Sequence, residues 1–207
     1  MTRNRTIALI AAIAALVLAG VWFARKADTV NGTAGEAGST VKTSGQALVG
    51  GPFTLTDQTG KTVTDQDFRG KYMLIFFGFT FCPDVCPTEL QIMAGAIDQL
   101  GDKGADVVPV FVTVDPDRDT PEALARYVQQ FHPRLVGLTG THEQIAAIAK
   151  AYRVYYQKVK EEGASDDSYT MDHSSVAYLM GPDGKFLAFF PPGVTPDQMA
   201  EKIASFL

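Results

Sequence analysis

The chain has 207 residues and a formal net charge of −5, with 46% hydrophobic residues. This length is enough for one well-cored domain with chain to spare. The acidic balance argues against nucleic acid and anionic lipid as binding partners, because both carry negative charge, and plain solubility is the alternative interpretation of the acidity.

Residues 1–26 are predicted to form an N-terminal membrane anchor. Arg3 and Arg5 precede an uncharged stretch at 6–24, and Arg25 and Lys26 close it. As a helix this stretch would span roughly 28 Å, close to the hydrocarbon thickness of a bilayer. A cleaved signal peptide is the competing interpretation, and the length and the closing charges favour the anchor. Because no long Arg/Ser-rich presequence is present, we expect a single-pass protein of a bacterial inner membrane with its C-terminal domain in the periplasm.

Residues 27–46 are rich in Gly, Ser, Thr and Ala and cannot bury a core, so they predict a flexible linker. The folded domain is expected over 47–207. All four basic residues of the anchor region, and no acid, lie before residue 27, so the charge of −5 becomes −9 for residues 27–207.

From residue 53 the pattern predicts strands alternating with helices, followed by a closing hairpin and helix. The expected elements are a hairpin at 53–64, a helical turn at 65–68, a strand at 72–79, a helix at 87–101, a strand at 107–114, a helix at 121–131, a strand at 135–138, a helix at 142–151, a strand at 154–159, a polar loop at 160–170, a hairpin at 175–190 and a helix from 196. Threonines at 120, 141 and 195 are placed to cap three of the helices. This order predicts an α/β sandwich with a central mixed sheet flanked by helices.

The only two cysteines, Cys82 and Cys86, follow the apolar strand at 72–79 and precede a helix that Pro87 is predicted to open. Residues four apart on a helical turn have Cβ atoms about 5–6 Å apart, which suits two thiolates on one soft metal ion and is within reach of a disulfide. The positive end of the helix is expected to lower thiol pKa values. A dithiol at this point predicts a thioredoxin-like fold, and an inert disulfide or two buried thiols is the alternative to a functional pair.

His173 lies just before the closing hairpin, in a loop that would face the dithiol in a thioredoxin-like topology. Two thiolates and one imidazole form a Cys₂His set, which suits copper(I) or zinc and is compatible with copper(II). Three protein ligands leave one coordination position open, as a site that passes its metal on requires. The alternative is that His173 merely caps its loop.

Several other polar or aromatic residues have competing interpretations. One interpretation of Asp115, Asp117 and Asp119 is that they orient the site or contact a partner. For Asp119, we instead expect that it braces its loop or the next helix. Asp84 either tunes the site or is a solvated turn residue, and Met171 is expected in the core. Structural roles are expected for His132 and His142, and a role as core and site wall for four aromatic residues, Phe76, Phe77, Phe79 and Phe81.

Three segments together resemble the Sco family, also called SenC, of copper proteins. They are GFTFCPDVCPT at 78–88, VDPDRDTP at 114–121 and DHS at 172–174, and the resemblance extends over about 48–207. It implies a membrane-tethered thioredoxin-like protein that binds a copper ion, as Cu(I) or Cu(II), through Cys82, Cys86 and His173. It also implies a role in assembling the CuA centre of cytochrome c oxidase, with subunit II of the oxidase as partner and another copper chaperone or a thiol reductant as further partners.

These observations favour a metallochaperone over a turnover enzyme. The second hypothesis is a thiol–disulfide reductase in which Cys82 and Cys86 reduce the cysteines of the CuA site. Three residues separate the two cysteines instead of the two found in thioredoxins, which argues against ordinary disulfide oxidoreductase activity. A peroxidase or redox sensor is the third hypothesis.

Overall fold

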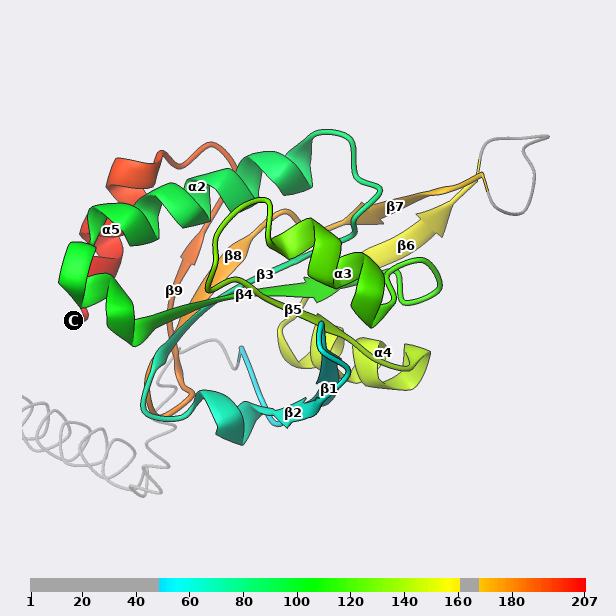
Figure 1. Cartoon of the computed structure of the whole chain (residues 1–207), viewed down its shortest axis with the longest axis horizontal. Helices are drawn as coiled ribbons and strands as arrows, with labels where there is room; N and C mark the ends of the chain where they lie inside the picture. The colour runs from blue at the N-terminus through cyan, green and yellow to red at the C-terminus, as the bar shows by residue number, and fades with distance from the viewer. Residues whose placement is uncertain (1–48, 161–167) are drawn as a thin grey trace, which may run out of the picture. The chain divides into compact units, whose positions relative to one another are not determined.

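The computed structural model describes residues 49–160 and 168–207, which belong to one compact unit, Gln46–Leu207 (Figure 1). The expected anchor at 1–26, the expected linker at 27–46 and most of the expected polar loop at 160–170 lie outside the described residues. Among the described residues, no helix is both long enough and apolar enough to span a bilayer.

A seven-stranded mixed sheet forms the centre of the domain, with the strand order β2-β1-β5-β4-β3-β8-β9. Strands β3, β4 and β5 run parallel, while β1 and β8 pair antiparallel with the two sides of this parallel group. The prediction of a mixed sheet is therefore confirmed. The bounds are β1 Thr54–Asp57, β2 Thr62–Thr64, β3 Tyr72–Gly78, β4 Val107–Thr113, β5 Val136–Thr139, β8 Ala177–Met180 and β9 Phe186–Phe190.

Helices cover both faces of this sheet (Figure 1). They are α2 Val85–Gln99, α3 Pro121–Val128, α4 His142–Ala151 and α5 Pro196–Ala204, with short 3₁₀ helices η1 Asp65–Phe68 and η2 Gly101–Asp106. Helices α2 and α3 connect the parallel strands β3, β4 and β5 in turn, and α5 packs along α2. The predicted caps are confirmed, because the side chains of Thr120, Thr141 and Thr195 accept backbone hydrogen bonds at the starts of α3, α4 and α5.

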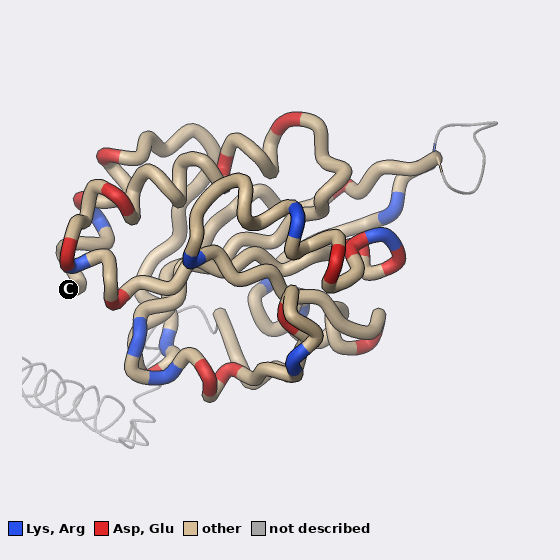
Figure 2. Tube along the Cα trace, viewed as in Figure 1, with Lys and Arg blue, Asp and Glu red and all other residues tan. Residues whose placement is uncertain are grey.

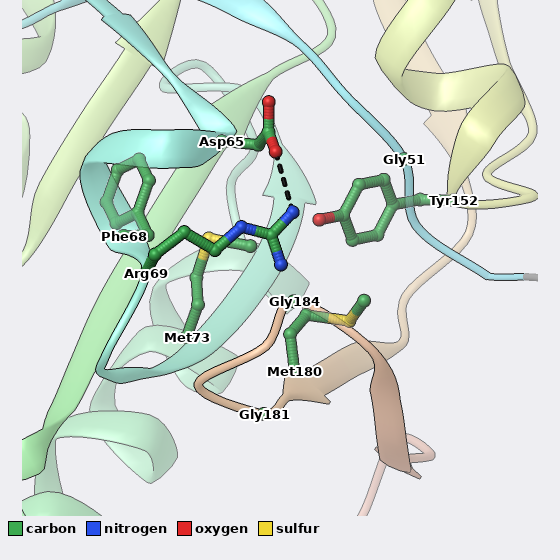
Figure 3. Close-up of a pocket in the computed structure, with 9 residues that line it drawn as sticks. All are labelled: Gly51, Asp65, Phe68, Arg69, Met73, Tyr152, Met180, Gly181 and Gly184. Carbon is green, nitrogen blue, oxygen red and sulfur yellow. Dashed lines mark hydrogen bonds and ion pairs between the residues drawn. The ribbon is translucent and has the colours of Figure 1, made fainter.

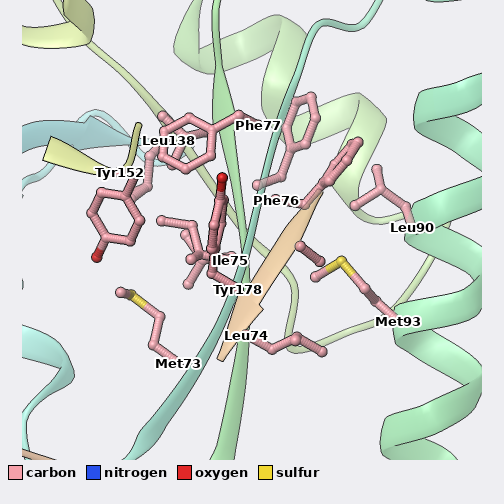
Figure 4. Packing of buried hydrophobic residues seen from close by; sticks show 14 of the residues in the cluster. Met73, Leu74, Ile75, Phe76, Phe77, Leu90, Met93, Leu138, Tyr152 and Tyr178 are labelled. Atoms are coloured by element: carbon pink, nitrogen blue, oxygen red, sulfur yellow. The ribbon is translucent and has the colours of Figure 1, made fainter. Parts of the chain in front are cut away.

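The central strand β3 is buried on both faces, as its continuous apolar run predicts. Leu74 and Phe76 point toward Leu90 and Met93 of α2 (Figure 4). Phe77 points to the other face, where its ring lies 5.4 Å from that of Tyr152, just after α4. The carboxyl end of this rigid strand is where the cysteine loop begins, so the packing fixes the origin of that loop.

A second, two-stranded sheet pairs β6 Tyr156–Val159 with β7 Thr170–His173 (Figure 1). The sequence pattern predicted the first of these strands but not the second. Strand β7 reads Thr-Met-Asp-His, which lacks a clear apolar alternation, so its extended form depends on pairing with β6. The consequence is that His173 ends a strand instead of lying in a loop.

Helix α2 differs from its prediction at both ends. It begins at Val85, so Pro87 is its third residue instead of its first, a position where a missing N–H is still tolerated. It ends at Gln99 and is followed by η2, which the pattern did not predict. The earlier start places Cys86 inside the helix while Cys82 remains in the preceding loop.

Candidate metal centre

The two thiols lie on either side of the start of α2. The backbone N–H of Cys82 donates to the carbonyl of Phe79 at 3.2 Å, which folds the loop into a turn. The backbone N–H of Cys86 donates to Sγ of Cys82 at 3.4 Å. Because Asp84 at the N-cap makes no side-chain capping bond, this sulfur satisfies one of the free N–H groups of the helix.

His173 reaches the thiols from the end of β7. Its Nε2 lies 3.4 Å from Sγ of Cys86, and its Nδ1 lies 3.1 Å from the carbonyl oxygen of Ser174. A carbonyl can only accept, so this bond holds the proton on Nδ1 and leaves the Nε2 lone pair facing the sulfur. The rings of Phe76 and Phe79 contact the imidazole edge-on, with centroids at 6.1 and 5.8 Å, and fix its plane.

The structure thus brings Cys82, Cys86 and His173 together, with their two sulfurs and one ring nitrogen all within 4.8 Å of one another. Two soft sulfurs and an imidazole suit copper or zinc. Within the described residues this is the one group of three or more such side chains spaced to hold a metal ion. A set of three also leaves a coordination position for a ligand from outside the chain.

Burial controls the charge state of the metal-free site. It raises the pKa of the Cys86 thiol, and the neighbouring Cys82 raises it further. The expected lowering by the helix N-terminus is therefore wrong for Cys86, since burial outweighs it. Burial also lowers the pKa of His173, so the imidazole is neutral at pH 7. A metal ion that binds here must displace the proton of the Cys86 thiol, whereas the neutral imidazole of His173 can act as a ligand without losing a proton.

Asp119 braces the cysteine loop from behind. Its carboxylate is fully buried and accepts from the N–H of Thr80 at 3.0 Å, the hydroxyl of Thr80 at 2.5 Å and the hydroxyl of Thr113 at 2.6 Å. Burial raises the pKa of Asp119, and the bonds from both threonines oppose that rise. The bracing role predicted for Asp119 is confirmed, because these bonds tie the loop before Cys82 to the end of β4.

Arg118 is the residue near the site that sequence reasoning missed. Its Nε donates to the buried carboxylate of Asp115 at 2.5 Å, and its guanidinium lies between two aromatic rings, 4.5 Å from that of Phe81 and 3.7 Å from that of Tyr169. Phe81 was expected in the core or site wall, but it is 62% exposed and lies on the surface beside Cys82. No local signal indicates the stack, because its members are far apart in the sequence.

The remaining candidates lie outside this cluster. Asp117 pairs with His142 at 2.8 Å and with Lys158 at 3.1 Å on the surface, where charged residues gather between the loop after β4 and the β6–β7 sheet (Figure 2). His132 is buried and accepts from the N–H of Arg134 at 3.1 Å, which confirms its structural role. Met171 is buried as predicted, and Asp84 is an exposed residue at the helix start.

We expect the metal-free, reduced protein to lose stability as the pH falls below about 6.5. The pKa of His173 is lowered from its usual 6.5 in the folded state, so below that value the unfolded chain binds more protons. The contribution of the neutral His173 imidazole to the free energy of unfolding is therefore complete above pH 6.5. It is lost as the pH falls toward the pKa of His173 in the folded state. Urea unfolding at pH 7.5 and 5.5 should show a smaller loss for His173→Gln than for wild type.

His132 provides the internal control for this measurement, because burial lowers its pKa as well and its effect remains in both proteins. The difference between the two pH dependences therefore isolates His173. Equal losses in wild type and His173→Gln would contradict the assignment of a buried, neutral imidazole.

A mixed sheet flanked by helices, with a dithiol between β3 and α2 and an imidazole facing it, defines a thioredoxin-like protein with a candidate metal site. A family model described as SCO1/SenC matches residues 41–207. The chain therefore belongs to the SCO1/SenC family.

Comparison with individual proteins gives the same result. The human protein SCO1 homolog, mitochondrial, is 46% identical over 165 residues, which are 79% of this chain and 54% of the human protein. This chain thus spans about half the length of that relative. The crystal structure of Arabidopsis thaliana ScoI with copper bound has a TM-score of 0.71 and 46% identity, over 76% of this chain and 96% of ScoI.

A more distant solved relative is BsSco, described as a member of the Sco family of cytochrome c oxidase assembly proteins in which a disulfide switch was identified. It has a TM-score of 0.59 and 28% identity, over 78% of this chain and 92% of BsSco. These comparisons confirm the resemblance to the Sco family. They also confirm the thioredoxin-like fold.

Proposed function

We propose that this chain is a metallochaperone that holds one copper ion between Cys82, Cys86 and His173 and passes it to the CuA centre of cytochrome c oxidase. The observation that carries the proposal is the convergence of two sulfurs and a free ring nitrogen within 4.8 Å. The copper found in Arabidopsis ScoI and the oxidase-assembly role of the BsSco family support the choice of metal and of pathway.

The geometry suits transfer by ligand exchange. Cys86 is fully buried, whereas Cys82 is partly exposed, and two exposed apolar residues, Phe81 and Val85, flank it in the sequence. An acceptor with its own Cys and His ligands could therefore take the open position and then replace Cys82. Subunit II of the oxidase is the acceptor that we propose.

We further propose that residues 1–26 anchor the chain in a bacterial inner membrane, with the linker at 27–46 carrying the domain at 47–207 in the periplasm. The support is the uncharged stretch at 6–24 between basic residues. Because an exported compartment is oxidising, the dithiol would need a reductant before it accepts copper, and a second chaperone would supply the ion.

A thiol–disulfide reductase is the second candidate. One observation favours it: Cys82 is accessible, and its sulfur lies within 4.8 Å of that of Cys86, where modest rotation would form a disulfide. Cys82 would attack a disulfide of the acceptor, and Cys86 would then displace the reduced acceptor thiol from the mixed disulfide. The acceptor gains two electrons, and the chain is left with a Cys82–Cys86 disulfide.

Metal binding by the full-length chain, reduced and handled without oxygen, separates these candidates. We expect one copper per chain and a loss of affinity greater than about a hundredfold in Cys82→Ser, Cys86→Ser and His173→Ala, because removing a ligand exceeds the 10–100-fold cost of disturbing its supports. The matched control is His142→Ala, which removes an exposed imidazole that pairs with Asp117 on the surface. Zinc serves as the competing metal.

The reductase makes the opposite prediction for His173→Ala, which should retain disulfide-reducing activity. Wild-type protein that binds no copper tightly, yet cycles between dithiol and disulfide, would overturn the metallochaperone and favour the reductase.

A further inference from the structure

The strand that carries His173 is held at its other end by contacts around Tyr169, which directly precedes β7. These contacts form the Tyr169 cluster, which consists of Asp115, Arg118 and Tyr169. The Tyr169 hydroxyl donates to the buried carboxylate of Asp115 at 2.8 Å, and Nη1 of Arg118 donates to the Tyr169 carbonyl at 3.0 Å. Nε of Arg118 donates to the other oxygen of Asp115 at 2.5 Å. Tyr169 is therefore bound through its hydroxyl and its carbonyl by two residues of the loop after β4.

Two cations also lie over the Tyr169 ring. The guanidinium of Arg118 is 3.7 Å from the ring centroid, and the ammonium group of Lys158 is 3.9 Å from it. Lys158 belongs to β6 and pairs with Met171 of β7, so the partner strand is held as well. Nη2 of Arg118 is buried and has no hydrogen-bond partner within the described part of the chain, a cost that these contacts must outweigh. The contacts thus fix both strands of the β6–β7 sheet at the end away from His173.

The β6–β7 sheet depends on such support, because it has two strands and is separate from the seven-stranded sheet. A pair of strands on its own is marginally stable in water. Within β6 and β7, both of which lie in the described part of the chain, Met171 is the one buried residue. At the His173 end, the N–H of Ser174 donates to the carbonyl of Tyr155 at 2.9 Å. Without the Tyr169 cluster, the opposite end of the pair would be free to open.

We propose that Tyr169 is a positioning residue for the copper site: by keeping β7 paired with β6, it keeps the imidazole of His173 3.4 Å from the sulfur of Cys86. This inference rests on the proposed function, which assigns that imidazole to copper. Tyr169 supplies no ligand and acts through His173, four residues further along the chain. The loop after β4 then supports both ligand-bearing segments, the cysteine loop through Asp119 and β7 through the Tyr169 cluster.

Tyr169→Ala tests the proposal, because it removes the ring and the hydroxyl but leaves Asp115 paired with Arg118. The matched control is Tyr155→Ala. Tyr155 directly precedes β6, is 53% exposed, and its hydroxyl donates to Gln157 at the surface. Both full-length variants are compared with wild type for amide hydrogen exchange of β6 and β7 without metal, and for copper(I) affinity by chelator competition.

For Tyr169→Ala we expect hydrogen exchange in β6 and β7 to accelerate at least about tenfold, the effect of losing one hydrogen bond to a charged group. Copper(I) affinity should fall about 10–100-fold, as when a group that orients a ligand is lost. In a His173→Ala background the same change should leave the affinity unaltered, because no imidazole remains to be positioned. Tyr155→Ala should alter neither the exchange nor the affinity.

Arg118→Lys tests the Tyr169 cluster from the other side, because lysine keeps the positive charge but lacks the planar guanidinium that makes two of the bonds. The matched control is Arg69→Lys at the amino-terminal end of β3. There Arg69 pairs with Asp65 at 2.8 Å and lines a pocket in which the Tyr152 hydroxyl is directed toward it (Figure 3). We expect both variants to melt at a lower temperature than wild type, and only Arg118→Lys to bind copper(I) more weakly.

Three results would overturn the proposal. The first is a Tyr169→Ala protein with wild-type exchange in β6 and β7 or with wild-type copper affinity. The second is an equal loss of affinity from Tyr169→Ala with and without the His173 imidazole, which would mean that Tyr169 does not act through it. The third is equal copper affinity in Arg118→Lys and Arg69→Lys. In all three, wild-type protein still binds copper; wild-type protein that binds none would instead refute the proposed function, and this inference with it.

Discussion

Gly78→Ala is expected to disrupt the metal centre from inside the sheet. Gly78 is the last residue of β3, and an added Cβ would lie 2.6 Å from Sγ of Cys86, 2.9 Å from Phe111 and 3.2 Å from Phe76. Contacts under 3.0 Å are not tolerated without movement, and both aromatic rings are fully buried. The sulfur or the strand must therefore shift.

The expected cost is about 1–3 kcal/mol in the free energy of unfolding, the usual range for overpacking a core. Copper affinity should fall by roughly 10–100-fold, as when the groups that orient a ligand are disturbed. Urea unfolding and chelator competition measure the two effects. Gly51→Ala is the matched control, because its nearest neighbour would be Cβ of Ala151 at 3.5 Å, an ordinary contact. Equal behaviour of the two variants would show that the close approach at Gly78 is unimportant.

This glycine illustrates what the sequence could and could not predict. The apolar run at 73–77, the dithiol after it and the periodic helix beyond predicted a buried strand, a loop with two thiols and a helix, because each is a local pattern. That Gly78 makes room for Cys86 depends on how α2 packs over β3, which no local pattern contains. Likewise, Pro87 correctly indicates the first turn of α2. A proline ring is compatible with more than one position in that turn, so the predicted helix begins two residues later than α2 does.

Partners distant in the sequence account for the other differences. Arg118 binds the carbonyl of Tyr169, 51 residues away, and stacks beneath Phe81. Apolar residues are often exposed, so the hydrophobicity of Phe81 did not decide its position. Strand β7 forms because β6 pairs with it, and His173 reaches the thiols only through that pairing. The sequence predicts the types of the metal ligands and the spacing of the two cysteines. It does not predict the surrounding contacts and the strand pairing that position them.

Asp119→Ala is expected to be the most destabilising change in the loop after β4. It leaves the N–H and hydroxyl of Thr80 and the hydroxyl of Thr113 without their acceptor. Asp119 and Thr113 are fully buried, and Thr80 is half-buried. Each unsatisfied buried group costs about 1–3 kcal/mol, and hydroxyl rotation can recover part of this for the two threonines. We therefore expect a loss of about 3 kcal/mol in the free energy of unfolding, measured by urea denaturation.

Asp117→Ala is the matched control, two residues earlier in the same loop. Its carboxylate is 45% exposed and pairs with Lys158 and His142 at the surface, so its loss should cost no more than about 1 kcal/mol. Asp119→Asn should lie between the two, because its one oxygen can still accept from the N–H of Thr80 and the hydroxyl of Thr113, while its amide nitrogen cannot accept from the hydroxyl of Thr80. Since Thr80 is two residues before Cys82, copper affinity should follow the same order. Equal stability of Asp119→Ala and Asp117→Ala would mean that the cysteine loop holds its shape without this brace.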